Sequence, residues 1–156
     1  MSQTTVDLQL ASTCAELPTE ADIELWVGTS LRILEQDESA ELTVRIVDET
    51  EALELNKTYR QRDYPTNVLS FPFEAPVELP VRLLGDLVVC APVIEREAAA
   101  QGKALSAHWT HMIVHGTLHL LGYDHIDDDE AVVMERLEQR ILEALGYADP
   151  YADDYV

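Results

Sequence analysis

Apolar and polar residues alternate along Val6–Leu10 and Leu42–Val47, and this pattern predicts two β-strands. Two further strands are expected over Val68–Phe71 and Leu83–Cys90. The stretch Leu83–Cys90 is the most apolar of them, which is typical of a central strand. Pro72, Pro76 and Pro80 predict a loop before it, because proline cannot donate a backbone hydrogen bond inside a sheet.

Apolar residues spaced three or four apart predict helices between these strands. Thr19 is a suitable N-cap for the first helix. Its apolar face carries Ile23, Trp26, Val27, Leu31 and Leu34. A short helix is expected over Glu51–Tyr59, and another from Pro92 to about Gln101, since proline is favoured in a first helical turn.

Two further helices are expected in the C-terminal third of the chain. Ala107–Leu121 forms the first, and Gly122 ends it because glycine readily takes the left-handed conformation of a helix C-terminus. Asp127 or Asp128 caps the second. Its apolar face includes Val133, Leu137, Ile141 and Leu145, and Gly146 and Pro150 end it.

These elements predict an α+β fold, because strands and helices both occur without strict alternation. We expect one domain over residues 1–156, with a mixed sheet of about four strands covered by about five helices. The start of the chain has no basic segment followed by an apolar one, so a cytoplasmic protein is expected. Cys14 and Cys90 are far apart in sequence and are expected to be free thiols.

The charge of the chain restricts its partners. The formal net charge is −20, which repels nucleic acid at long range, so DNA is not an expected partner. No apolar run approaches the length of a membrane span, so a membrane is not expected either. The charge is uneven, however. Lys57, Arg60 and Arg62 stand close together without an acid among them, whereas residues 124–156 are rich in acids.

All five histidines fall between His108 and His125. His115 and His119 are four residues apart, so both imidazoles lie on one face of the predicted helix. His125 is able to join them only if the chain turns back, and Gly122 permits that turn. Three imidazoles suit one zinc ion and leave a fourth position open for water. We therefore predict one zinc per chain on His115, His119 and His125, at a helix and the turn after it.

The histidines have two other interpretations. In one they are ordinary polar residues near a helix end, and in the other they form a closed structural zinc site with Asp124, Asp127 or a cysteine as fourth ligand. His111 lies one turn before His115 and is expected to line the cleft rather than bind the ion, since three turns of ligands span about 11 Å. The spacing also matches metzincin proteases, but Gly116 replaces the glutamate that acts as their general base.

The motif His115–His125 resembles the H-G-x-L-H-L-x-G-Y-D-H signature of the YbeY family of bacterial endoribonucleases. The segments Leu55–Arg60, Asp63–Pro72 and Leu84–Cys90 are similar to other blocks of that family, and the resemblance runs over residues 40–150. It implies an α+β metal-binding fold with zinc on the three histidines. It also implies cytoplasmic action on single-stranded RNA, in 3′-end maturation of small-subunit ribosomal RNA and in ribosome quality control. Arg60 corresponds to an active-site arginine of the family.

The residues fit phosphodiester cleavage. Zinc polarises a phosphoryl oxygen and acidifies water, and a guanidinium such as that of Arg60 binds phosphate through two parallel hydrogen bonds. We therefore expect Arg60 and His115 to be catalytic, and ribosomal RNA and small-subunit components to be partners. Asp86 and Asp124 are candidates to orient a ligand histidine. Asn67 and Ser70 follow the predicted turn and are candidates to contact substrate, although hydrogen bonds to neighbouring strand backbone would equally account for them.

Two questions remain open from the residues alone. Either water or the ribose 2′-hydroxyl attacks the phosphate, and no general base is evident. Two other functions compete with RNA cleavage. One is a zinc hydrolase that acts on peptides or another small substrate. The other is a non-enzymatic ribosome-assembly factor in which zinc stabilises the fold and the acidic C-terminal region contacts basic ribosomal proteins.

Overall fold

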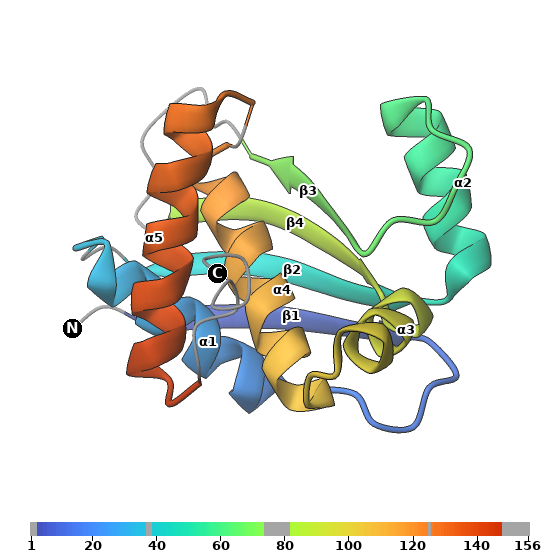
Figure 1. Ribbon diagram of the computed structural model, residues 1–156, viewed down its shortest axis with the longest axis horizontal. Helices are drawn as coiled ribbons and strands as arrows, with labels where there is room; N and C mark the ends of the chain where they lie inside the picture. Colours follow the sequence, from blue (N-terminus) through green and yellow to red (C-terminus); the bar gives the residue numbers. More distant parts are fainter. Residues whose placement is uncertain (1–2, 37–38, 74–81, 125, 148–156) are drawn as a thin grey trace.

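A computed structural model describes residues 3–36, 39–73, 82–124 and 126–147 of the chain. It contains a four-stranded sheet in the order β1-β2-β4-β3 (Figure 1). The strands are β1 (Thr4–Ala11), β2 (Ala40–Val47), β3 (Val68–Pro72) and β4 (Arg82–Cys90). Strands β1, β2 and β4 are parallel, and β3 runs antiparallel to β4 along one edge. The predicted mixed sheet is confirmed, and β4 is an interior strand as its apolar sequence indicates.

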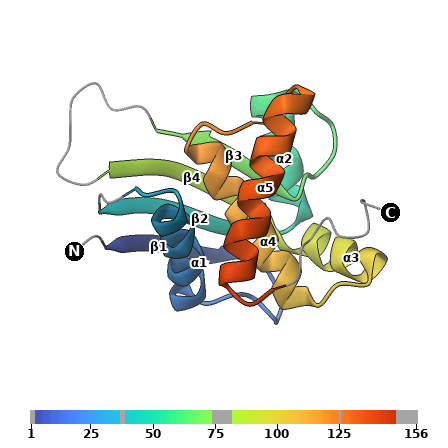
Figure 2. The same ribbon diagram turned by 60° about the vertical axis from the view of Figure 1, so that its left-hand side comes forward.

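Within the described residues, five helices accompany the sheet. They are α1 (Glu20–Ile33), α2 (Glu49–Arg60), α3 (Ala91–Gln101), α4 (Leu105–Leu120) and α5 (Asp128–Ala144). Helices α1 and α4 cover one face of the sheet, and α5 packs against these two helices (Figures 1 and 2). Helices α2 and α3 begin directly after β2 and β4, so both lie at the carboxyl end of the parallel strands. The α+β expectation is confirmed.

The helix starts follow the predicted capping chemistry. The Thr19 hydroxyl accepts a hydrogen bond from the Asp22 amide, and the Asp22 carboxylate accepts one from the Thr19 amide, which forms a capping box. The Asp127 carboxylate caps α5 by accepting from the Glu130 amide. Pro92 lies in the first turn of α3.

The apolar core lies mainly between the sheet and the covering helices. Its centre contains fully buried side chains from both layers: Ile23, Val27, Val44, Ile46, Leu87, Val89 and Ile113. A smaller cluster forms on the other face of the sheet, where Ala52 of α2 packs near Val88 and Cys90. Both cysteines are free thiols, as predicted, and the thiol of Cys90 is buried.

The predicted apolar face of the last helix is partly wrong. Val133 is half exposed, whereas Met134 is buried, so the true face is rotated by one residue. It contacts the core through Met134, Ile141 and Leu142, together with Leu137 and Leu145 at its margins. Pro76, Pro80 and Pro150 lie outside the described residues. Within the described parts of the chain, no helix is long and apolar enough to cross a membrane.

Candidate active site

The site begins with a close contact between α4 and the sheet. A β-carbon added at Gly116 would lie 2.8 Å from Cδ2 of Leu87 and 3.3 Å from Cγ2 of Val68. Glycine therefore allows α4 to approach β3 and β4 more closely than any other residue would. The contact also explains why no glutamate follows His115, because a longer side chain at position 116 would point into the packed sheet.

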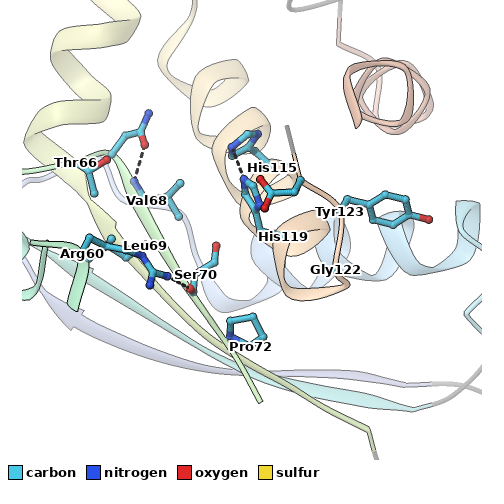
Figure 3. Close-up of a pocket in the computed structure, with 12 residues that line it drawn as sticks. Arg60, Thr66, Val68, Leu69, Ser70, Pro72, His115, His119, Gly122 and Tyr123 are labelled. Carbon is cyan, nitrogen blue, oxygen red and sulfur yellow. Dashed lines mark hydrogen bonds between the residues drawn. The ribbon is translucent and has the colours of Figure 1, made fainter. Parts of the chain in front are cut away.

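His115 and His119 lie on one face of α4, as their spacing predicts. Their Nε2 atoms are 3.1 Å apart, and both side chains line a cavity of about 670 Å³ (Figure 3). Two nitrogens that bind one zinc ion tetrahedrally are separated by about 3.3 Å, given Zn–N bonds of about 2.05 Å. The observed separation therefore fits two ligands of a single ion.

Gly122 ends α4 with the geometry expected of a helix-terminating glycine. Its φ angle is 99°, its amide donates to the His119 carbonyl, and the Tyr123 amide donates to the Leu118 carbonyl. This pair of bonds is the Schellman arrangement. The chain turns back there. His125, the third predicted ligand, lies outside the described residues. The described residues alone contain no group of three histidine, cysteine or acidic side chains able to hold a metal ion.

A fully buried glutamate on α5, which the sequence analysis did not identify, contacts the histidines. Oε1 of Glu138 is 2.6 Å from Nδ1 of His115, and Oε2 is 3.2 Å from Nε2 of His111. Burial alone would raise the pKa of Glu138, but the hydrogen bonds and charges of the two histidines outweigh it and lower that pKa to about 2. Glu138 is therefore a carboxylate at neutral pH. The signal for it was an acid within the apolar face of the last helix.

His111 and His108 do not line the cavity. His111 is buried and contacts Glu138, so the expectation that it lines the cleft is wrong. His108 is also buried, and its Nε2 atom is 3.0 Å from the Glu97 carboxylate on α3. Burial lowers the pKa of His108, and the neighbouring Glu97 opposes that effect.

The wall of the cavity opposite the histidines consists of the loop before β3, β3 itself and the end of α2. Asn56 fixes this loop, because its buried side-chain amide donates to the Tyr64 carbonyl at 2.7 Å. Arg60 occupies the last turn of α2, and its Nη2 atom donates to the Ser70 carbonyl at 2.8 Å. The guanidinium also lies over the Phe71 ring, 5.4 Å from its centroid. Figure 3 shows Arg60 on β3's side of the cavity, facing the helix that bears His115 and His119.

The charge around the cavity partly matches the sequence expectation. Arg60 lines the cavity, whereas Lys57 and Arg62 are exposed and do not line it. Asp124 is the acid among the described lining residues. None of the described acidic side chains of α5, Glu138 included, belongs to this lining.

Three other residues were candidates for the site from the sequence, and only two of them line the cavity. Asn67 lines the cavity, but its amide donates to Glu97 and its carbonyl oxygen accepts from the Val68 amide, so it serves the local structure. The Ser70 hydroxyl also lines the cavity and lies 3.4 Å from the Gly116 carbonyl. Asp86 is exposed on the opposite face of the sheet from its buried neighbour Leu87 and lines a separate hollow there. Asp86 therefore does not orient a ligand histidine, and the sequence-based expectation that it would do so is wrong.

The fold is similar to a known structure. The solution structure of TM1509 from Thermotoga maritima superimposes with a TM-score of 0.54 at 21% sequence identity. The match covers 92% of this chain and 97% of that chain. At this identity the likeness establishes the shared fold.

The sequence also matches a family model. The model is described as "Endoribonuclease YbeY", and it matches residues 9–146. The match spans nearly the whole chain, including β3, α4 and the entire lining of the cavity. Members of this family cleave RNA internally in ribosomal RNA maturation. The chain belongs to the YbeY family of endoribonucleases.

Proposed function

We propose that the chain is a single-strand-specific, zinc-dependent endoribonuclease whose active site is the cavity between α4 and β3. The observation that supports this most directly is the placement of Arg60 and the two histidines His115 and His119 on one cavity. A pair of imidazole nitrogens that suits a metal ion thus lies across from a guanidinium that suits phosphate. Family membership supports RNA cleavage as the reaction, and this arrangement supports these residues as the ones that act in it.

His115, His119 and His125 are the proposed ligands of one zinc ion per chain. The separation between the Nε2 atoms of His115 and His119 fits this role. In addition, the Glu138 carboxylate accepts a hydrogen bond from Nδ1 of His115. That hydrogen bond leaves the lone pair of His115 Nε2 directed to the cavity. When bound, zinc supplies Lewis acidity, which polarises a phosphoryl oxygen and lowers the pKa of water.

Arg60 binds and orients the scissile phosphate in this proposal. The Ser70 carbonyl and the Phe71 ring hold its guanidinium in place, so little side-chain entropy is lost when substrate binds. A guanidinium has five N–H donors in a fixed plane, and the bond to Ser70 uses one nitrogen. The remaining donors stabilise charge that develops on the phosphate during transfer.

The local charge makes an RNA substrate compatible with the net charge of −20. The cavity lining contains Arg60, two histidines and Asp124, and an ion held by neutral imidazoles would keep its positive charge. A phosphate therefore meets a positive centre at the cavity, although most of the surface repels it. A single strand reaches this centre more easily than a duplex, whose second strand adds charge that must approach the acidic surface.

Peptide hydrolysis is the main competing activity, and the structure disfavours it. A metzincin-like protease needs a glutamate directly after the first histidine. Gly116 takes that place, and even a β-carbon there would lie 2.8 Å from Cδ2 of Leu87, so a larger side chain would force the packed leucine to shift. Glu138 does not replace that glutamate, because it is fully buried and lies behind His115, on the side of Nδ1.

The proposed biological setting is 3′-end maturation of small-subunit ribosomal RNA and ribosome quality control, in the cytoplasm and with ribosomal components as partners. Family membership supports the RNA substrate and ribosomal RNA processing. The quality-control role and the cytoplasmic location are proposals taken from the same resemblance.

Cleavage assays with the full-length protein test this function. Single-stranded RNA, duplex RNA, single-stranded DNA and a peptide substrate are compared before zinc removal, after it, and after zinc is restored. We expect zinc-dependent cleavage of single-stranded RNA and no cleavage of DNA or peptide. End-group analysis of the products distinguishes attack by water from attack by the 2′-hydroxyl, because the latter leaves a 2′,3′-cyclic phosphate. Cleavage that persists without zinc would overturn the metal-dependent mechanism, and zinc binding without any cleavage would favour the assembly-factor function.

A further inference from the structure

Helix α5 contains a charged side chain at a core position, where an apolar side chain is usual. Glu138 is 0% exposed and lies on the same face as Met134, Ile141 and Leu142, which pack against α4. An ionised carboxylate in such surroundings is strongly destabilising unless hydrogen-bond donors surround it. The contacts that Glu138 makes therefore explain why this position tolerates a charge.

Both carboxylate oxygens of Glu138 face histidines of α4. Oε1 is 2.6 Å from Nδ1 of His115, and Oε2 is 3.2 Å from Nε2 of His111. A carboxylate accepts hydrogen bonds and cannot donate them, so each of these nitrogens is the donor. His115 is consequently held as the tautomer that is protonated on Nδ1, with its Nε2 lone pair directed to His119 and the cavity.

His111 has a separate task in this arrangement. It lies one helical turn before His115, is 6% exposed, and does not line the cavity. Its contact with the second oxygen fixes the rotation of the carboxylate about its long axis. Glu138 therefore joins α5 to two successive turns of α4, and the direction of the first oxygen toward His115 is set by both histidines.

We propose that Glu138 is the positioning residue of the metal site, and that His111 holds it in place. Glu138 selects the tautomer of His115, fixes its ring, and makes its Nε2 atom a stronger donor to a metal. The inference rests on the proposed function, since it requires a metal at His115. It also gives α5 a part in the site, although this helix contributes no side chain to the described cavity lining.

Zinc affinity of the full-length protein provides the test. Glu138→Gln preserves the size of the side chain and removes its charge, and Glu143→Gln is the matched control because Glu143 is an exposed acid on the same helix. Zn²⁺ is titrated against a chromogenic chelator at neutral pH. We expect Glu138→Gln to bind zinc about 10–100-fold more weakly and Glu143→Gln to bind like the wild type. His111→Asn should weaken zinc binding by a smaller factor.

A second measurement does not depend on whether the variant folds. ¹⁵N chemical shifts of the imidazoles report the tautomer of His115 in the wild-type protein without zinc. We expect protonation on Nδ1 of His115 in the wild type. Protonation of wild-type His115 on Nε2 would overturn the inference, as would equal zinc affinity in wild type and Glu138→Gln. Absence of zinc binding to the wild type would instead overturn the proposed function together with the inference.

Discussion

Gly116 and Leu87 lie so close that a β-carbon at position 116 would be 2.8 Å from the Leu87 side chain. This contact brings α4 against β3 and β4 and sets the distance across the cavity. We predict that Gly116→Ala destabilises the protein by about 1–3 kcal/mol, as expected for an overpacked core. Urea-induced unfolding measures the change.

Gly28→Ala is the control for this prediction. Gly28 is also within a helix, but a β-carbon there would make only ordinary contacts with Thr4, the closest at 3.4 Å. Because alanine favours helices over glycine, this variant should be neutral or more stable by up to about 1 kcal/mol. Equal destabilisation by the two variants would show that close packing at Gly116 is not the cause.

The backbone of Gly122 gives a different prediction. Its φ angle of 99° is unfavourable for a β-branched residue, and no atom lies within 4 Å of the position that a β-carbon would take. We expect Gly122→Val to cost about 1–3 kcal/mol of stability and to weaken zinc binding, because it strains the turn that follows His119. Leu121→Val, at a residue with right-handed helical angles, should affect zinc binding less. Zinc titration of both variants checks this order, and the reverse order would contradict it.

Arg60 is predicted to act on the substrate and not on the metal. We expect Arg60→Ala to reduce RNA cleavage about 100-fold or more while zinc content stays unchanged, because a charge-stabilising donor is lost. Arg60→Lys should restore only part of the rate, since lysine lacks the planar pair of donors. Lys57→Ala is the control, because Lys57 lies on the same helix and does not line the cavity. Wild-type cleavage by Arg60→Ala would remove Arg60 from the mechanism.

Zinc removal should destabilise the fold. The proposed ligands join α4 to the turn after Gly122, so binding free energy adds to the free energy of unfolding. At a zinc concentration about 100 times Kd the gain is about 2.7 kcal/mol, or about 5–10 °C in Tm for a chain of this size. Thermal unfolding with and without a chelator measures it. An unchanged Tm after removal of confirmed bound zinc would refute the coupling.

The sequence predicted those features of the site that depend on local spacing. Four-residue spacing placed His115 and His119 together, and a glycine after them predicted the turn that Gly122 makes. Alternation likewise identified β1 and β2, and the apolar run Leu83–Cys90 identified β4 and its interior position.

Features that depend on long-range packing were missed or wrong. Glu138 is 23 residues from His115 in sequence, and only the docking of α5 on α4 brings them together. The phase of α5 was off by one residue, because Val132 and Val133 are both exposed and obscure the buried face. Asp86 was misassigned because an aspartate in an apolar strand does not reveal which face of the sheet it occupies.

The central claim is that the cavity between α4 and β3 is a metal-dependent site for RNA cleavage. A comparison of the wild type with His115→Ala tests this claim. Zinc content, by elemental analysis, and cleavage of single-stranded RNA are measured on the same sample of each protein. We predict one zinc per chain and cleavage in the wild type. His115→Ala should lose the zinc and cleave at least about 100-fold more slowly, with its far-ultraviolet circular dichroism retained. A His115→Ala protein that lacks zinc yet cleaves RNA at the wild-type rate would contradict the account.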